Sequence, residues 1–124
     1  FFEAHSIRSE VPRFFEGRLP DINLGTAKGA SADPELARRL LDCAKAQAGY
    51  TSVLNGRFTG GYNTRHYGRP QDHMHAVQLE LSQITYMDEN PPFAFDETKA
   101  NRVRPALHAI VETMAAWGRE RYGR

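Results

Sequence analysis

The chain has 124 residues, with 16 Lys and Arg against 15 Asp and Glu and a formal net charge of +1. This length fits one domain or part of one, and the near balance of charge gives no general attraction for nucleic acid or for an anionic membrane. Hydrophobic residues make up 40% of the chain and charged residues 25%, which is ordinary for a folded protein. We therefore expect a packed domain with a small-molecule partner, and neither nucleic acid nor a membrane as partner.

The hydrophobic segments, the single cysteine and the first residues of the sequence bear on where the protein is located and whether the domain is complete. No stretch approaches the roughly 20 apolar residues of a membrane span, and no cationic segment precedes an apolar run as in a signal peptide. Cys43 cannot form an internal disulfide, which favours a reducing compartment, so we expect a cytoplasmic protein. Because the chain opens on Phe1 and Phe2, as if within a strand, 1–124 is predicted to be a single partial domain of a longer protein.

The first third of the chain predicts mostly loop. Residues 1–4 are apolar-rich and lead into the polar run 5–9, which predicts a strand that ends at His5 and passes into a loop. Residues 10–32 contain two prolines and three glycines, which excludes a long helix and leaves room for a short strand at 21–24.

A helix is predicted to begin after Ser31 or Asp33, with Pro34 in its first turn. Apolar residues then recur at helical spacing until Gly49: Leu36, Leu40, Leu41, Ala44 and Ala48. Residues 51–54 predict a strand that enters Asn55-Gly56. The following segment, 56–68, holds four glycines among polar and aromatic residues, and we expect a mobile or ligand-approaching loop there.

The last third predicts one strand and one helix. Between 75 and 81 the sequence alternates, with His75, Val77, Leu79 and Leu81 on one face and Glu80 on the other. After Asn90-Pro91-Pro92, an apolar stripe of helical period runs to about residue 123, and Pro105 must lie in the first turn of this helix or kink it. The mixture of strands and helices predicts an α/β fold.

Glu3 and His5 form the first candidate site. The spacing places both side chains on one face of a strand, and a neutral imidazole at a strand end is a good metal ligand that a carboxylate can orient. The alternative, which without further clues is the commoner case, is an ordinary core or surface histidine.

Four side chains in the glycine-rich segment form the second candidate: Arg57, Arg65, His66 and Arg69. Glycines let the backbone approach a ligand closely, and guanidinium groups match carboxylate or phosphate oxygens, so the segment suits a small anion. The alternative is a solvated basic turn whose tyrosines pack on the core.

Glu80 is the third candidate, because a carboxylate on an otherwise apolar strand is partly desolvated and its pKa is raised towards the range of a general base. The alternative is a glutamate that faces solvent at a sheet edge. His73 and His75 could bind metal as a pair, but His75 falls on the apolar face, which favours a core role. His108 lies beside the apolar stripe of the last helix and is expected to be structural.

Four runs in this order resemble the N-formylglutamate amidohydrolase (deformylase) family: His5-Ser6-Ile7-Arg8-Ser9, residues 20–26 (PDINLGT), residues 55–70 (NGRFTGGYNTRHYGRP) and residues 75–80 (HAVQLE). The resemblance spans nearly the whole chain, weakens after about Asp88 and corresponds to the C-terminal half of such enzymes. It implies a three-layer α/β/α sandwich with a mixed central sheet, similar to zinc carboxypeptidases.

The resemblance also implies roles for single residues. His5 matches the late zinc ligand of the family, with Glu3 in place of the usual Asp, and Glu80 matches the general base. Arg65, together with Arg8 or Arg69, resembles the groups that receive the carboxylates of the substrate. His66 is expected to contribute to the same binding segment.

The implied reaction is hydrolysis of N-formyl-L-glutamate to formate and L-glutamate in histidine degradation, with one Zn²⁺ or another divalent metal as cofactor and a dianionic substrate. The other zinc ligands of the family lie in a proline-histidine-serine-glycine region that is not in this sequence, so we expect 1–124 alone to be inactive. The alternatives are a non-catalytic module that binds a small anion, and an inert truncated homologue whose exposed strand edge leads to aggregation or to a homo-oligomer.

Overall fold

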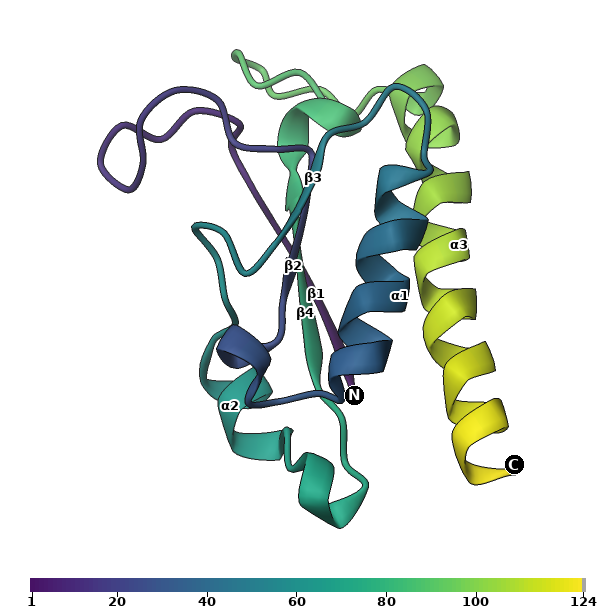
Figure 1. Cartoon of the computed structure of the whole chain (residues 1–124). Coiled ribbons are helices and arrows are strands. Elements are labelled where there is room, and N and C mark those ends of the chain that lie inside the picture. The colour runs from purple at the N-terminus through teal and green to yellow at the C-terminus, as the bar shows by residue number, and fades with distance from the viewer. Residues whose placement is uncertain (124) are drawn as a thin grey trace.

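A four-stranded mixed sheet forms the centre of the computed structural model, which describes residues 1–123 (Figure 1). Its strands are β1 (Phe2–Ile7), β2 (Ile22–Gly25), β3 (Ser52–Leu54) and β4 (Val77–Ser82), in the spatial order β1-β4-β2-β3. β1 is parallel to β4, β4 is antiparallel to β2, and β2 is parallel to β3. The α/β class and the mixed sheet expected from the sequence are therefore confirmed.

The alternation of β4 gives the sheet two different faces. Val77, Leu79 and Leu81 are buried in the apolar core with residues of β2, whereas Gln78 and Glu80 point to the opposite face, as a strand period of two requires. We call these the apolar face and the polar face. The predicted division of this strand into two faces is correct.

Two helices cover the apolar face, α1 (Pro34–Lys45) and α3 (Glu97–Tyr122) (Figure 1). The Asp33 side chain accepts a hydrogen bond from the backbone N–H of Glu35 and so caps α1, which decides between the two predicted caps. Buried residues from both helices and from β2 and β4 form one cluster: Ile22, Leu24, Ala32, Leu36, Leu40, Ala44, Val77, Leu79, Leu81, Val103, Ala106, Ile110 and Trp117.

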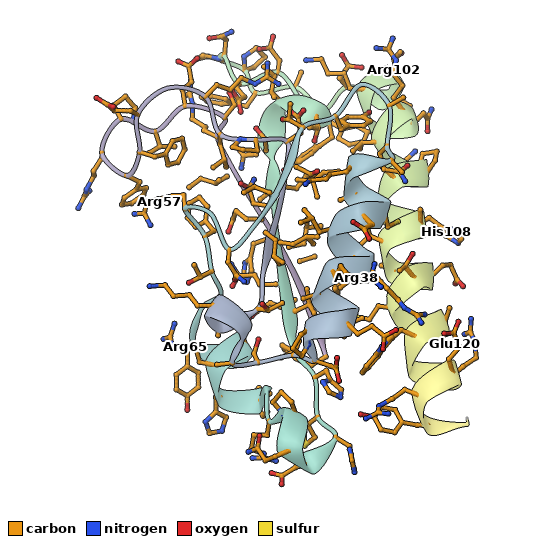
Figure 2. All side chains as sticks on the ribbon, in the orientation of Figure 1. Arg38, Arg57, Arg65, Arg102, His108 and Glu120 are labelled. Atoms are coloured by element: carbon orange, nitrogen blue, oxygen red, sulfur yellow. The ribbon has the colours of Figure 1, made fainter. Side chains whose placement is uncertain are left out.

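α3 begins earlier than its apolar stripe indicated. Asp96 caps it through the backbone N–H of Lys99, so Pro105 lies inside the helix rather than in its first turn. The helix continues through Pro105 to a left-handed Gly123 at φ 67°. His108 is exposed on the outer side of α3 and contributes nothing to the core, so the structural role expected for it is wrong (Figure 2).

Two further predictions need correction. β1 does not end at His5 but runs to Ile7, because it pairs with β4 over all six of its residues. The segment 56–68 is not loop throughout, since it contains the short helix α2 (Tyr62–Tyr67).

The polar face differs from the apolar face in what covers it. Within residues 1–123 it has α2 and loops but no long helix, so the described part of the chain contains two of the three expected layers (Figure 1). None of the helices in residues 1–123 is both long enough and apolar enough to cross a membrane.

Candidate functional site

The register of the sheet places His5 and Glu80 side by side on the polar face. His5 of β1 is the direct partner of Glu80 of β4, and Asn23 of β2 is the partner of Glu80 on its other side. Directly paired residues of neighbouring strands point to the same face of a sheet. An imidazole, a carboxylate and an amide thus form a row across three strands.

Glu3 fixes the imidazole of His5 from the same strand. Its Oε1 lies 3.1 Å from His5 Nε2 and accepts a hydrogen bond of 2.7 Å from Asn63 Nδ2 of α2. The hydrogen bond from Asn63 lowers the pKa of Glu3 against the opposing effect of desolvation, and the contact with His5 lowers it further. Because Glu3 engages Nε2, Nδ1 of His5 is the ring nitrogen left for another ligand, and the side chain is half exposed.

Glu80 lies in a drier environment than Glu3. The residue is only 8% exposed, and burial raises the pKa of its carboxyl group, against the smaller opposing effect of His5. Within residues 1–123 no side chain donates a hydrogen bond to its carboxylate; Asn23 Nδ2 donates instead to the backbone oxygen of Glu80 at 3.0 Å. A carboxyl group with a raised pKa is suited to moving protons near neutral pH.

The glycine-rich segment is attached to the polar face by β4. Gln78 Oε1 accepts a hydrogen bond of 2.8 Å from the N–H of Gly61, the residue that precedes α2. Arg65 donates to the carbonyl of Gly60 at 2.9 Å, and the rest of its guanidinium is exposed. Arg57 and Arg65 lie on the side of the sheet opposite α1 and α3, where the polar face is (Figure 2).

The other predicted binding residues are placed less closely together. Arg69 is paired with Asp72 at 3.1 Å, and the ring of His66 stacks on Tyr62 at 5.0 Å between centroids. Arg8 follows Ile7, the last residue of β1, whereas Glu3, which contacts Asn63 of α2, lies near the beginning of that strand. The structure therefore brings Arg65 and His66 onto one short helix and leaves Arg8 apart from them.

Three polar residues of the site were not singled out from the sequence: Asn23, Asn63 and Gln78. Gln78 shares the polar face with Glu80 in the alternation of β4, and that pattern could have identified it. Asn63 had no such signal, because its contact with Glu3 joins residues 60 positions apart.

The described residues supply only part of a metal site. Among residues 1–123 there is no group of three or more His, Cys, Asp or Glu side chains that could hold a metal ion. His5, with its carboxylate partner Glu3, fits a single imidazole ligand and the group that orients it. A catalytic zinc normally needs three protein ligands, so any such ion needs further ligands from outside these residues.

The described residues form an α/β domain with a mixed sheet that carries a histidine and a glutamate side by side on its polar face, and comparison with known proteins identifies the family. The family model described as N-formylglutamate amidohydrolase matches residues 1–87, which ends where the motif resemblance weakens. The chain belongs to the N-formylglutamate amidohydrolase family.

Two curated relatives are each named N-formylglutamate deformylase. The protein of Pseudomonas aeruginosa is 59% identical over 121 residues, which cover 98% of this chain and 46% of the relative. The protein of Pseudomonas putida is 54% identical over 123 residues, which cover 99% of this chain and again 46% of the relative. The chain thus spans less than half the length of these relatives.

A solved structure has the same fold. It is the crystal structure of N-formylglutamate amidohydrolase from Ralstonia eutropha JMP134, with a TM-score of 0.77 and 22% identity. The similarity covers 96% of this chain and 43% of that one.

Proposed function

We propose that the protein to which these residues belong hydrolyses N-formyl-L-glutamate to formate and L-glutamate, as a step of histidine degradation in the cytoplasm. Membership of the family and the two relatives named N-formylglutamate deformylase support a hydrolase of this class. The observation that carries the proposal for this chain is the direct pairing of His5 with Glu80 on the polar face.

The proposal includes one zinc ion in a three-layer fold similar to zinc carboxypeptidases. His5 would hold the ion through the nitrogen that Glu3 does not engage, and the remaining ligands would come from residues outside this chain. When bound, zinc lowers the pKa of a water molecule towards about 7 and polarises a carbonyl oxygen.

Glu80 would act as the general base and acid. Its carboxylate accepts a proton from the attacking water and then delivers it to the nitrogen that leaves with L-glutamate. Burial of Glu80 favours both proton transfers. A raised pKa makes the carboxylate a better proton acceptor, and the protonated group can still donate to the leaving nitrogen.

Arg65 would receive a carboxylate of the substrate, which is a dianion. Its exposed guanidinium is held at one end by Gly60, and this leaves the other nitrogens for a bidentate contact. Arg8, Arg69 and His66 are the further candidates, and of these Arg69 must first give up Asp72.

Substitution of Glu80 in the complete protein tests the proposal. Glu80→Gln is expected to lower kcat for formate release by about 10²- to 10⁴-fold, because the amide cannot accept the proton, while zinc content stays unchanged. His5→Ala should lower zinc content as well as activity, and Glu112→Gln, on the far side of the molecule in α3, is the matched control.

The opposite results would contradict the proposal. Normal turnover of the Glu80→Gln protein would show that Glu80 takes no part in the reaction. Binding of N-formyl-L-glutamate without metal and without formate release would instead support the non-catalytic module that binds a small anion.

A further inference from the structure

A cavity lies at the end of the sheet where β4 ends and β3 begins. It has a volume of about 470 Å³, and its wall includes Arg18, Tyr50, Ile84, Thr85, Lys99 and Arg102. Arg102 is near the beginning of α3, whereas Arg65 lies in α2, at the other end of the molecule (Figure 2). The cavity contains no residue of the His5 and Glu80 row.

The single acidic group in the wall is already satisfied. Asp21 accepts hydrogen bonds from Arg18 at 2.8 Å, from the backbone N–H of Thr51 at 2.9 Å and from the Thr51 hydroxyl at 3.1 Å. The carboxylate is 7% exposed, so its charge is compensated by Arg18 and turned away from solvent. It presents little repulsion to an incoming anion.

Two cations of the wall have no such compensation. Among the described residues, Lys99 Nζ donates only to the carbonyl of Met87, at 3.3 Å. Neither Lys99 nor Arg102 forms an ion pair with any carboxylate of residues 1–123. They are three residues apart on α3, and side chains at this spacing are neighbours on a helix surface.

The rest of the wall is apolar or neutral. The ring of Tyr50 packs against the core cluster, and Ile84 lines the same cavity. Burial raises the pKa of the Tyr50 hydroxyl, against the effect of Arg102, so the phenol remains a hydrogen-bond donor. A cavity with neighbouring cations, a hydroxyl donor and an apolar wall matches an organic anion rather than a bare ion.

We propose that this cavity is a binding site for a small aliphatic dicarboxylate. Lys99 and Arg102 receive its carboxylates, the Tyr50 hydroxyl donates to one of them, and Ile84 contacts the methylene groups. The site is independent of the proposed hydrolase reaction, because it uses none of the same side chains.

Titration of the chain with adipate, followed by two-dimensional NMR, tests the site. We expect saturable shifts of the backbone amides of Tyr50, Thr85 and Lys99. Arg102→Gln or Lys99→Gln is expected to weaken adipate binding about tenfold, because each removes a charge-assisted hydrogen bond.

The controls separate this site from others. Arg104→Gln, two residues after Arg102 on α3 and paired with Glu97, must leave adipate binding unchanged, and so must Arg65→Gln on the polar face. 1,6-Hexanediol, which lacks charge, and inorganic phosphate, which lacks an apolar body, should each bind at least tenfold more weakly. The proposal is overturned by absence of saturable binding, by full affinity in Arg102→Gln, or by phosphate binding as tightly as adipate.

Discussion

His75 shows how one side chain is held in one protonation state by its surroundings. Its Nδ1 accepts a hydrogen bond from the backbone N–H of Asp33 at 3.1 Å, so Nε2 carries the proton and donates to the Tyr122 hydroxyl at 2.6 Å. Protonation of Nδ1 would point its N–H at the backbone N–H of Asp33, so that two donors face each other and the hydrogen bond is lost. Burial lowers the pKa of this imidazole, and the negative charge of Asp33 opposes this effect.

This arrangement predicts a pH-dependent stability. Below the ordinary pKa of 6.5 the unfolded chain takes up a proton that the folded ring resists, so the free energy of unfolding should fall as pH drops from 7.5 to 5.5. Urea unfolding at several pH values measures this slope. His75→Asn, whose amide oxygen can replace Nδ1 as acceptor, should reduce the slope, whereas His108→Asn on the exposed side of α3 should not. An equal slope in both variants would contradict the role of His75.

At the scale of elements, the close approach of β2 to the glycine-rich segment determines where α2 lies. A Cβ at Gly25 would lie 2.6 Å from the carbonyl carbon of Thr59 and 2.9 Å from the nitrogen of Gly60, both of which are backbone atoms. The segment is held there by the hydrogen bond from Ala27 N–H to the Thr59 carbonyl. No side chain can move aside to relieve such a contact.

Gly25→Ala is therefore expected to destabilise the chain by about 1–3 kcal/mol, the usual cost of overpacking, and to loosen α2. Hydrogen exchange should show faster exchange of the α2 amides, with a lower midpoint in urea. The matched control is Gly118→Ala in α3, where a Cβ meets nothing within 4 Å and should stabilise the helix by up to about 1 kcal/mol. Equal urea midpoints and equal α2 exchange rates in the two variants would contradict a close contact between β2 and residues 59–60.

The same elements show what one sequence can predict. α1 was predictable because its cap, its first-turn proline and its apolar spacing are local signals. α2 was not, because this six-residue helix depends on Gln78 of β4 and on Glu3 of β1 for its attachment. Likewise the alternation of each strand placed Glu80 on a polar face, but its pairing with His5 depends on a register between segments far apart in sequence.

At the scale of the whole molecule, the polar face depends on the packing behind it. The strands that carry His5 and Glu80 are supported on their other face by α1 and α3, and Ile110 of α3 is fully buried in that cluster. Its neighbour Val111 is 46% exposed, although it too is a β-branched aliphatic residue. The two positions therefore offer a matched pair of aliphatic residues with opposite burial.

Ile110→Ala is expected to lower the free energy of unfolding by about 2–5 kcal/mol, because the lost methyl groups leave a cavity between the helices and the sheet. Val111→Ala should change it by no more than about 0.5 kcal/mol. Since a domain of this size has about 5–15 kcal/mol of stability in all, the first change should also speed hydrogen exchange in β4. Equal effects of the two substitutions in urea unfolding would show that α3 packs on the sheet through a different face.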